Sequence, residues 1–378
     1  MIKVLHVITD LNTGGAEKML AQVIPVLKSG GIEQSVVCLR STGPVAKIIE
    51  ENGICVTCLN MKPAVPSYGA FQRLKKTAAD DRPDLIHSWL YHADLYASLV
   101  GRKLQIPVIW GLHNATLSPN VKLSTRLVVS QLAHLSQSVP RRIISCSRSG
   151  KQNHIDMGYR GDIITVIPNG FDTDRFKPNS EMRRKKRCEL GISDDNILIG
   201  NISRFDSQKD HLTLIQAWKE LLQKVPGIHF RFLLVGSGLN WENKELRDWI
   251  CDAGLESRML LLGERDDIPA LLNAIDIFTL SSIGEAFPLA LGEAMSSGLL
   301  CVTTDVGDAP YLLDDCGILV PKNNPAALAE AIRKMVFLSA EEQDVLRFKS
   351  RQRIIEHFSI LQMGMAYIKV YQECLSIG

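Results

Sequence analysis

The sequence contains no run of about 18 consecutive apolar residues, the length that a membrane-spanning helix requires. Its first residues, 2–8, are typical of a buried strand and lack the charged start and cleavage site of a secretion signal. Hydrophobic residues make up 46% of the chain and charged residues 22%, as in globular proteins. We therefore expect a globular cytoplasmic protein without a membrane span.

Signatures of common cofactor and metal sites are also missing. The glycines after the first strand do not have the GxGxxG spacing of a dinucleotide site. Cys55 and Cys58 have CxxC spacing, but no second pair or helix start follows them, so we interpret the nine cysteines as reduced structural thiols. Asp172-Thr173-Asp174 spells a DxD metal motif in a segment that favours a turn. We expect neither a cofactor nor a metal.

The net charge of +2 is unevenly distributed along the chain. Residues 1–178 contain 21 Lys and Arg against 13 Asp and Glu, a charge of +8, whereas residues 179–378 contain 22 against 28, a charge of −6. The basic half suggests attraction to an anionic membrane surface. The predicted patch, in one helical region, consists of Arg126, Arg141, Arg142, Arg148 and Lys151. The run RRKKR at 183–187 favours a solvated helix face over a nucleic-acid or lipid patch, and we expect no nucleic-acid partner.

Apolar strand-like runs alternate with amphipathic helical stretches such as 16–28, 211–224 and 326–338. The first series of expected strands is 3–8, 34–39, 85–88, 108–112, 143–146 and 163–167. The second series is 197–202, 230–235, 259–262, 277–279, 300–303 and 317–320. This alternation predicts parallel sheets that are covered by helices on both faces.

Two such series predict an α/β fold with two doubly wound, Rossmann-like domains that face a cleft. Polar residues crowd at 176–196, so we expect an N-terminal domain of residues 1–178 and a C-terminal domain of residues 179–358. Residues 359–378 form a helical tail with an expected apolar face of Ile360, Leu361, Met365, Ile368, Tyr371 and Leu375. Ligands of open parallel sheets bind beyond the carboxyl ends of the strands, which places the expected site in the cleft.

Three segments after expected strands carry candidate ligand-binding groups. Gly14 and Gly15 precede a helix, so backbone amides can approach an anion there, although such turns often only connect elements. Arg204 and Lys209 follow the first strand of the second series, where two cations can converge on a diphosphate unless they are ordinary surface charges. His113 ends a strand of the first series and has a simple hydrogen-bonding role as its alternative.

Residues 284–298 (GEAFPLALGEAMSSG) place two glutamates in an otherwise apolar run. Pro288 suits the first turn of a helix, which puts Glu285 just before the helix and Glu293 about two turns inside it. Amides at 287–289 would then face a phosphate, Glu293 could accept both hydroxyls of a ribose, and Glu285 could accept those of a sugar. A charged helix face is the alternative, which the apolar surroundings disfavour.

Together these motifs resemble the retaining GT-B glycosyltransferases of family four over nearly the whole chain. The resemblance is carried by Gly14-Gly15-Ala16-Glu17, His113, IPNGFD at 167–172, Arg204 with Lys209, and Glu285-x7-Glu293 followed by Ala294-Met295. The turn TDVGD at 304–308 resembles members that build bacterial surface polysaccharides. The resemblance implies a GT-B fold whose C-terminal helix crosses back to the first domain.

The resemblance also implies a role for each matching residue. Arg204 and Lys209 would neutralise the donor diphosphate, and Glu285 would bind the transferred sugar near His113; these four are the expected catalytic residues. The expected donor-binding residues are Gly14, Gly15, Gly236, Arg265, Phe287, Pro288, Leu289 and Glu293. Among them, Glu293 would bind the ribose, and the backbone near Gly236 and Arg265 would hold the nucleobase.

The implied function is transfer of a sugar from a nucleoside-diphosphate sugar, with UDP expected as the nucleotide. The implied acceptor is a saccharide or a polyprenyl-diphosphate-linked saccharide, in lipopolysaccharide or capsule synthesis at the inner face of the cytoplasmic membrane. Ser203 and Ala286 stand where the family often has glycine, which affects fine geometry more than activity. A UDP-sugar 2-epimerase and a non-catalytic sugar-nucleotide sensor are the alternatives, and the two-glutamate segment favours transfer. Acceptor choice is expected to lie in residues 59–69 and 113–124.

Overall fold

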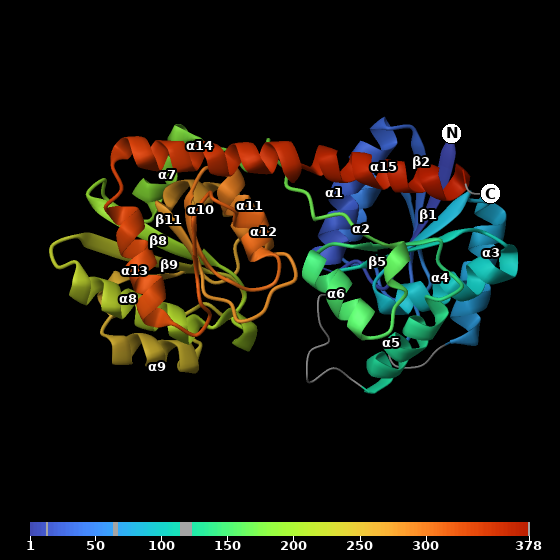
Figure 1. The fold of residues 1–378 in the computed structure, drawn as a ribbon, viewed down its shortest axis with the longest axis horizontal. Helices are drawn as coiled ribbons and strands as arrows, with labels where there is room; N and C mark the ends of the chain where they lie inside the picture. Colours follow the sequence, from blue (N-terminus) through green and yellow to red (C-terminus); the bar gives the residue numbers. More distant parts are fainter. Residues whose placement is uncertain (13, 63–66, 114–122, 377–378) are drawn as a thin grey trace. The chain divides into compact units, whose positions relative to one another are not determined.

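The computed structural model describes residues 1–12, 14–62, 67–113 and 123–376. The chain forms two compact units, one built from Met1–Gly170 together with Ile360–Gly378 and the other from Phe171–Ser359. The expected domain boundaries lie at residues 178 and 358, whereas the contacts change from one unit to the other after Gly170 and Ser359. Each unit contains one parallel sheet with helices on both sides, as expected from the alternating pattern (Figure 1).

The first unit is built on a sheet whose described strands follow the order β3-β2-β1-β4-β5-β6-β7. These strands are β1 (Ile2–Ile8), β2 (Ile32–Cys38), β3 (Cys55–Cys58), β4 (Leu85–Trp89), β5 (Val108–Leu112), β6 (Arg142–Ser145) and β7 (Ile164–Val166). The helices are α1 (Gly15–Ser29), α2 (Pro44–Glu51), α3 (Tyr68–Asp81), α4 (Tyr91–Leu104), α5 (Leu123–Leu135), α6 (Arg148–Asp156) and α15 (Ile360–Ser376). The strand order reverses between β1 and β4, which makes the loops after these strands the topological switch point.

Strand β3 is the one strand of the described sheets that the sequence analysis missed. It is only four residues long, lies at the sheet edge and pairs in parallel with β2, with Cys58 opposite Cys38. None of its residues is fully buried, so it lacks the apolar character by which the other strands were found. The CxxC motif is therefore part of an edge strand, and all nine cysteines are free.

The second unit has a sheet whose described strands follow the order β10-β9-β8-β11-β12-β13, with its switch point between β8 and β11. These strands are β8 (Asn196–Ile202), β9 (His229–Val235), β10 (Met259–Leu261), β11 (Ile277–Leu280), β12 (Leu300–Thr304) and β13 (Ile318–Val320). The first helices are α7 (Ser180–Glu189), α8 (His211–Lys224), α9 (Lys244–Ala253) and α10 (Ile268–Ala274). They are followed by α11 (Leu289–Ser296), α12 (Ala309–Leu313), α13 (Pro325–Val336) and α14 (Ala340–His357).

The second sheet has a hydrophobic core on each face because successive side chains of a strand point in opposite directions. One core contains Leu198, Leu233, Phe278 and Cys301, together with residues of α10, α11 and α12. The other contains their neighbours Ile199, Leu234, Ile277 and Val302, together with residues of α8 and α13. Burial on both faces explains why these strands read as continuous apolar runs.

The C-terminal helix α15 packs against α1 within the first unit. The expected apolar face of this tail was wrong for Leu361 and Met365, which are 57% and 52% exposed, whereas Tyr371 is buried as expected. The buried stripe consists of Met363, Gly364, Tyr367, Val370, Tyr371 and Cys374. Both stripes fit a helical period, and Gly364 favours the buried one: a Cβ there would collide with the side chain of Val26 on α1, so the two helices approach closely at this glycine.

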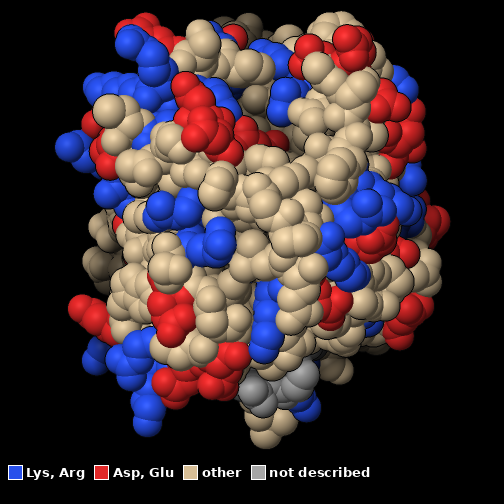
Figure 2. Space-filling model, turned by 90° about the vertical axis from the view of Figure 1, so that its left-hand side faces the viewer, with Lys and Arg blue, Asp and Glu red and all other residues tan. Residues whose placement is uncertain are grey.

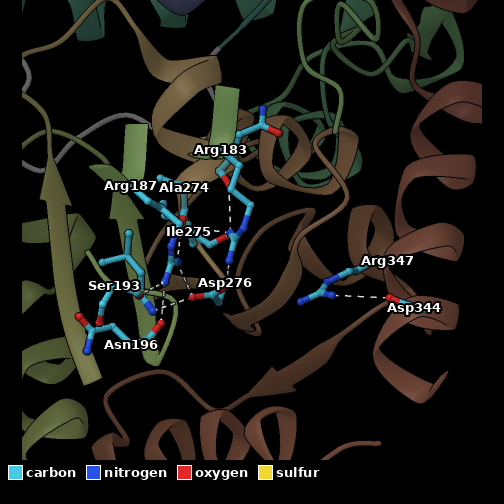
Figure 3. A network of polar contacts seen from close by, with 11 residues as sticks. Arg183, Arg187, Ser193, Asn196, Ala274, Ile275, Asp276, Asp344 and Arg347 are labelled. Atoms are coloured by element: carbon cyan, nitrogen blue, oxygen red, sulfur yellow. Dashed lines mark hydrogen bonds and ion pairs between the residues drawn. The ribbon is translucent and has the colours of Figure 1, made fainter. Parts of the chain in front are cut away.

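The basic run at 183–187 was expected to be a solvated helix face, and this was wrong for Lys186 and Arg187, whose side chains are 9% and 4% exposed, whereas that of Arg183 is 38% exposed. Arg183 and Arg187 point into the unit from α7 and both bind the Asp276 carboxylate, at 2.5 and 3.0 Å (Figure 3). Lys186 forms ion pairs with Glu189 and Asp267. The strand-to-strand connection around α10 supplies Asp276 and Asp267, which local sequence cannot reveal, whereas Glu189 lies on α7 itself.

The predicted membrane patch of five cations does not lie in one helical region. Arg126 is on α5, Arg141 and Arg142 flank the start of β6, and Arg148 and Lys151 are on α6. Arg141 donates to the carbonyl of Cys374 at the end of α15, and Lys151 donates to that of Ile164. Arg141 and Lys151 thus support the ends of neighbouring elements.

Basic and acidic side chains are interspersed on the face of the molecule that Figure 2 shows, the side at which α8 and α13 lie in Figure 1. No patch of a single sign dominates this view. Within the described residues, none of the helices is both long and apolar enough to cross a membrane.

Candidate functional site

The loops after β8 and β11 meet at the switch point of the second sheet. The backbone N–H of Ile283 donates to the carbonyl of Gln208 at 2.8 Å, and the Ser281 hydroxyl donates to that of Lys209 at 2.8 Å. Asp210, in the left-handed region at φ 47°, caps α8 through the N–H of Thr213 and ends the first loop. The two loops therefore form one bonded layer at the carboxyl edge of the sheet, where ligands of doubly wound folds bind.

Lys209 and Glu285 are brought into direct contact by this layer. The Lys209 Nζ lies 2.5 Å from Glu285 Oε1, and the Ser282 hydroxyl donates to the same oxygen at 2.7 Å. Their side chains are 20% and 11% exposed, so the pair is largely shielded from water. An ammonium has three donors, and the bond to Glu285 occupies one of them. Glu285 thereby holds a cation whose remaining donors can bind an anion.

Arg204 stands at the start of the same layer with a side chain that is 68% exposed. Its Nε lies 3.3 Å from Asp206 Oδ2. A hydrogen bond from the Gln208 N–H lowers the pKa of the Asp206 carboxyl, and Arg204 and Lys209 lower it further. Asp206 is thus a stable anion that orients Arg204 at the protein surface.

Ser203, which stands where the family often has glycine, is built into a hydrogen-bond network. Its hydroxyl donates to Asn201 Oδ1 at 2.7 Å and accepts from His211 Nε2 at 3.0 Å. Burial lowers the pKa of His211 to about 4, so the ring is neutral and carries its proton on Nε2. The serine therefore stiffens the loop that carries Arg204 and Lys209.

The residues expected at the nucleobase are also adjacent. Gly236, at φ +143°, donates to the carbonyl of Gly263 at 2.8 Å, and a Cβ at Gly236 would collide with the carbonyl of Ser203. The Arg265 guanidinium makes two 2.8 Å hydrogen bonds to Asp267, and this contact holds the pKa of that carboxyl well below its usual range. The structure thus brings Gly236 and the Arg265 loop together, while the Arg265 side chain is engaged with Asp267.

Helix α11 begins later than the sequence analysis expected. Pro288 is the capping residue before the helix, Leu289 is its first residue, and Glu293 is its fifth, so Glu293 lies about one turn inside and not two. The Phe287 ring stacks on Phe171 in the core, with ring centres 6.0 Å apart. At position 287 only the backbone, and not the buried side chain, can serve a ligand.

Gly307 supports the segment before α11 from the following loop. It has φ +54°, and a Cβ there would collide with the carbonyl of Glu285. The neighbouring N–H of Asp308 donates to the carbonyl of Ala286 at 3.2 Å. The loop after β12 therefore packs directly against the backbone of Glu285, and a side chain at position 307 would displace that backbone.

In the first unit, Gly14 and Gly15 lie at the switch point, directly before and at the start of α1. A Cβ at Gly14 would collide with the carboxylate of Glu17, which is 7% exposed. Burial raises the pKa of Glu17. The group closest to Gly14 is therefore this buried carboxyl, which is the end of a flexible side chain.

His113 follows β5 of the first unit. Its ring lies parallel to the Trp89 indole, with ring centres 4.8 Å apart and an interplanar angle of 14°. Its Nε2 is buried and has no hydrogen-bond partner within the described residues. Burial lowers the pKa of His113 to about 4, so the ring is neutral near pH 7.

Sequence reasoning missed several groups that hold these side chains in place. They are Ser282 beside Glu285, His211 beside Ser203, and Trp89 beneath His113. Gly307 behind Glu285 lies in the turn 304–308, which was noted only for its resemblance. The signals for the other three were a polar or aromatic residue at the end of a strand or the start of a helix. Residues 63–66 and 114–122 of the expected acceptor loops lie outside the described part of the chain. Within that part, no cluster of His, Cys, Asp or Glu is arranged to hold a metal ion.

Two family models match the two units. The model for Glycosyltransferase Family 4 matches residues 13–175, and the model for Glycosyl transferases group 1 matches residues 196–336. The chain matches both models and contains two parallel sheets, each with a topological switch point. Together these features identify a GT-B glycosyltransferase. The chain belongs to this family.

Curated relatives and solved structures agree with this assignment. A galactosyltransferase of Escherichia coli, "UDP-Gal:alpha-D-GlcNAc-diphosphoundecaprenol alpha-1,3-galactosyltransferase", is 24% identical and aligns over 96% of this chain and 94% of its own. The "Putative glycosyltransferase EpsF" of Bacillus subtilis is 25% identical over 80% of this chain and 79% of its own. Anabaena HepE, solved in complex with UDP, has a TM-score of 0.86 at 24% identity, covering 98% of this chain and 100% of that one.

Proposed function

We propose that the chain is a retaining, metal-independent glycosyltransferase that moves a sugar from a UDP-linked donor to a saccharide or polyprenyl-diphosphate-linked acceptor in surface-polysaccharide synthesis. The contact between Lys209 and Glu285 at the switch point of the second sheet carries this proposal. The printed names of relatives support its details. The E. coli relative uses UDP-Gal and a diphosphoundecaprenol-linked acceptor, and HepE was solved with UDP and glucose.

The proposed chemistry follows the charges of the reaction. Breaking the bond between the anomeric carbon and the diphosphate leaves negative charge on the leaving group. Lys209 and Arg204 stabilise that charge, and fixed cations of this kind are commonly the largest catalytic contribution. Lys209 is held by Glu285 before the reaction begins, so little reorganisation is needed.

The remaining assignments are part of the same proposal. Glu285 accepts hydroxyls of the transferred sugar, Glu293 accepts those of the ribose, and amides around Phe287, Pro288 and Leu289 face the diphosphate. Gly14 and Gly15 support the diphosphate from the first unit, and His113 binds the transferred sugar. The acceptor attacks from the face that the diphosphate leaves, so the anomeric configuration is retained.

Product analysis tests the proposal. The protein is incubated with UDP-, GDP- and ADP-linked sugars and a lipid-linked saccharide, with and without EDTA, and products are followed by mass spectrometry and by NMR of the anomeric proton. We expect a UDP-linked donor to give a glycosylated acceptor of unchanged anomeric configuration at equal rates in both conditions. An altered free sugar nucleotide would identify an epimerase. Failure of every nucleoside diphosphate to bind by calorimetry would reject transfer altogether.

We also propose that the protein docks peripherally on an anionic membrane. The docking surface is a different one from the predicted patch of Arg126, Arg141, Arg142, Arg148 and Lys151. A groove of about 540 Å³ lies between α3 and α4. It is lined by Ser67, Tyr68, Phe71, Leu95, Tyr96, Leu99, Arg102 and Lys103. Tyr68 and Leu99 are 76% and 44% exposed, and the two cations lie at the end of α4. Apolar side chains beside cations suit an acyl chain beneath an anionic headgroup.

Vesicle flotation tests the docking surface. The wild type should float with phosphatidylglycerol vesicles and not with phosphatidylcholine vesicles. Leu99→Asp should abolish flotation, whereas Phe348→Asp, at an exposed apolar residue of α14, should not. Equal flotation of the two variants, or no lipid preference in the wild type, would reject this surface.

A further inference from the structure

We infer that Trp89 is a positioning residue for His113, and that a buried hydrogen-bond chain through His6 and Gln34 sets the plane of its ring. This inference rests on the role proposed for His113 at the transferred sugar. All of these residues belong to the first unit.

The hydrogen-bond chain starts at the indole of Trp89 and has only one consistent assignment of its protons. Trp89 Nε1 can only donate, and it lies 3.2 Å from His6 Nδ1, so His6 accepts there. His6 must then carry its proton on Nε2, which donates to Gln34 Oε1 at 3.3 Å. The amide nitrogen of Gln34 in turn donates to the carbonyl of Ile24 on α1 at 3.1 Å.

Each member of the chain is enclosed. Trp89 and His6 are fully buried, and Gln34 is 7% exposed. Burial lowers the pKa of His6 to about 4, so the neutral form that this assignment requires is the form present near pH 7. A polar network that is satisfied throughout makes its members rigid, because turning any ring leaves a buried group unpaired.

Other rings close the remaining space around Trp89. The ring centre of His87 lies 4.7 Å from the indole, and that of Tyr367 on α15 lies at 5.9 Å. His87 is held by the Tyr371 hydroxyl at 2.7 Å from its Nδ1. The indole is therefore fixed in its plane by packing as well as by its N–H.

None of the described residues forms a comparable hydrogen bond with His113. Its buried Nε2 has no partner within the described residues, while its ring lies nearly parallel to the indole. The stacking surface of Trp89 is thus the contact that orients the imidazole. A neutral, oriented imidazole can exchange hydrogen bonds with a sugar hydroxyl without rearrangement.

Kinetics of four variants test the inference: Trp89→Phe, Trp89→Leu, His113→Ala and the double variant Trp89→Leu/His113→Ala. Misplacing His113 should lower kcat about 10- to 100-fold in Trp89→Leu, with little change in KM for the donor. Trp89→Phe keeps an aromatic face and should recover most of this loss. In the His113→Ala background, Trp89→Leu should cause no further loss, because it acts through His113.

Trp110→Leu is the matched control. Trp110 is a fully buried tryptophan of the neighbouring strand β5, and its N–H donates to Ser98 on α4 and not toward His113. Both Leu variants lose a buried indole, so both should be destabilised. A fall in kcat of the same size in Trp110→Leu, or additive losses in the double variant, would overturn the positioning role.

An NMR measurement tests the stacking of His113 on Trp89 without depending on the proposed function. The indole should shift the imidazole proton resonances of His113 upfield in the wild type, and this shift should disappear in Trp89→Leu and persist in Trp110→Leu. Absence of the shift in the wild type would overturn the inference. Failure of the wild type to transfer any sugar would reject the proposed function but leave this measurement interpretable.

Discussion

Lys209 and Glu285 act as a pair at the residue scale. Each side chain neutralises the charge of the other, which would otherwise be largely buried and unpaired. Removing one partner of such a pair lowers the stability of the protein. The same contact leaves donors of the ammonium available to a diphosphate. In the proposed mechanism, charge pairing in the free protein and charge stabilisation in the reaction would thus depend on one side chain.

Replacing Lys209 by Ala should therefore lower kcat about 10²- to 10³-fold, the loss typical of removing a fixed charge-stabilising donor. The measurement is transfer to the lipid-linked saccharide under saturating donor. Lys219→Ala, at an exposed lysine of α8, is the control and should keep full activity. Normal turnover in Lys209→Ala would exclude this lysine from the reaction.

Buried histidines predict how stability changes with pH. Burial lowers the pKa of His6 from 6.5 to about 4, so between these values the unfolded chain binds a proton that the folded chain does not. The free energy of unfolding should therefore decrease as the pH falls through 6.5 towards 4, by about 3 kcal/mol for this residue. His87, which faces His6, also has a lowered pKa and adds to the effect.

Urea unfolding between pH 7.5 and 5 measures this dependence. The wild type should lose stability throughout the acidic part of the range, and His6→Phe should lose less per pH unit because one titrating group is gone. A flat wild-type profile between pH 6.5 and 5 would contradict the burial of these histidines as neutral rings.

Helix α7 is held at the element scale by an ionic clamp. Arg187 is 3% exposed and donates to Asp276 and to the carbonyls of Ala274, Ser193 and Asn196 (Figure 3). Asp276 also accepts the backbone N–H of Leu198 at 2.8 Å. The helix that opens the second unit is therefore tied to the start of β8 and the end of α10.

Replacing Arg187 by Met should lower the free energy of unfolding by about 3–5 kcal/mol, because several buried acceptors lose their donor. Arg184→Met, on the exposed side of the same helix, should change it by less than about 0.5 kcal/mol. Urea unfolding of both variants makes the comparison. Equal stability of the two would show that the clamp contributes nothing.

At the scale of the whole molecule, the chain leaves the first unit after Gly170 and returns to it at Ile360. The returning helix α15 completes the first unit by packing on α1, with Tyr367 and Tyr371 against the ring of His87. Stability of the first unit thus depends on residues at both ends of the sequence.

Gly364→Leu should push α15 away from Val26 and destabilise the first unit by about 1–3 kcal/mol, the usual cost of overpacking. Hydrogen exchange should become faster in α1, β1 and β4 but not in β8 and β9. Met365→Leu, at an exposed position of the same helix, is the control. Uniformly faster exchange in both units would contradict this local role.

Local sequence determined the doubly wound fold, because strands buried on both faces are continuous apolar runs and amphipathic helices separate them. All described strands except β3 were predicted from this pattern, as were α1, α8 and α13. The motifs also located Arg204, Lys209 and Glu285 at strand ends. Whether these residues have the proposed roles stays a prediction.

Tertiary structure decided which side chains become partners. The pairing of Lys209 with Glu285, the burial of Arg187 and the stacking of His113 on Trp89 join residues from different strands and helices. The buried face of α15 was set by the fit of Gly364 to α1, since more than one stripe has the helical period. Contacts between residues distant in the chain depend on how sheets and helices pack, and periodicity within one segment carries no information about them.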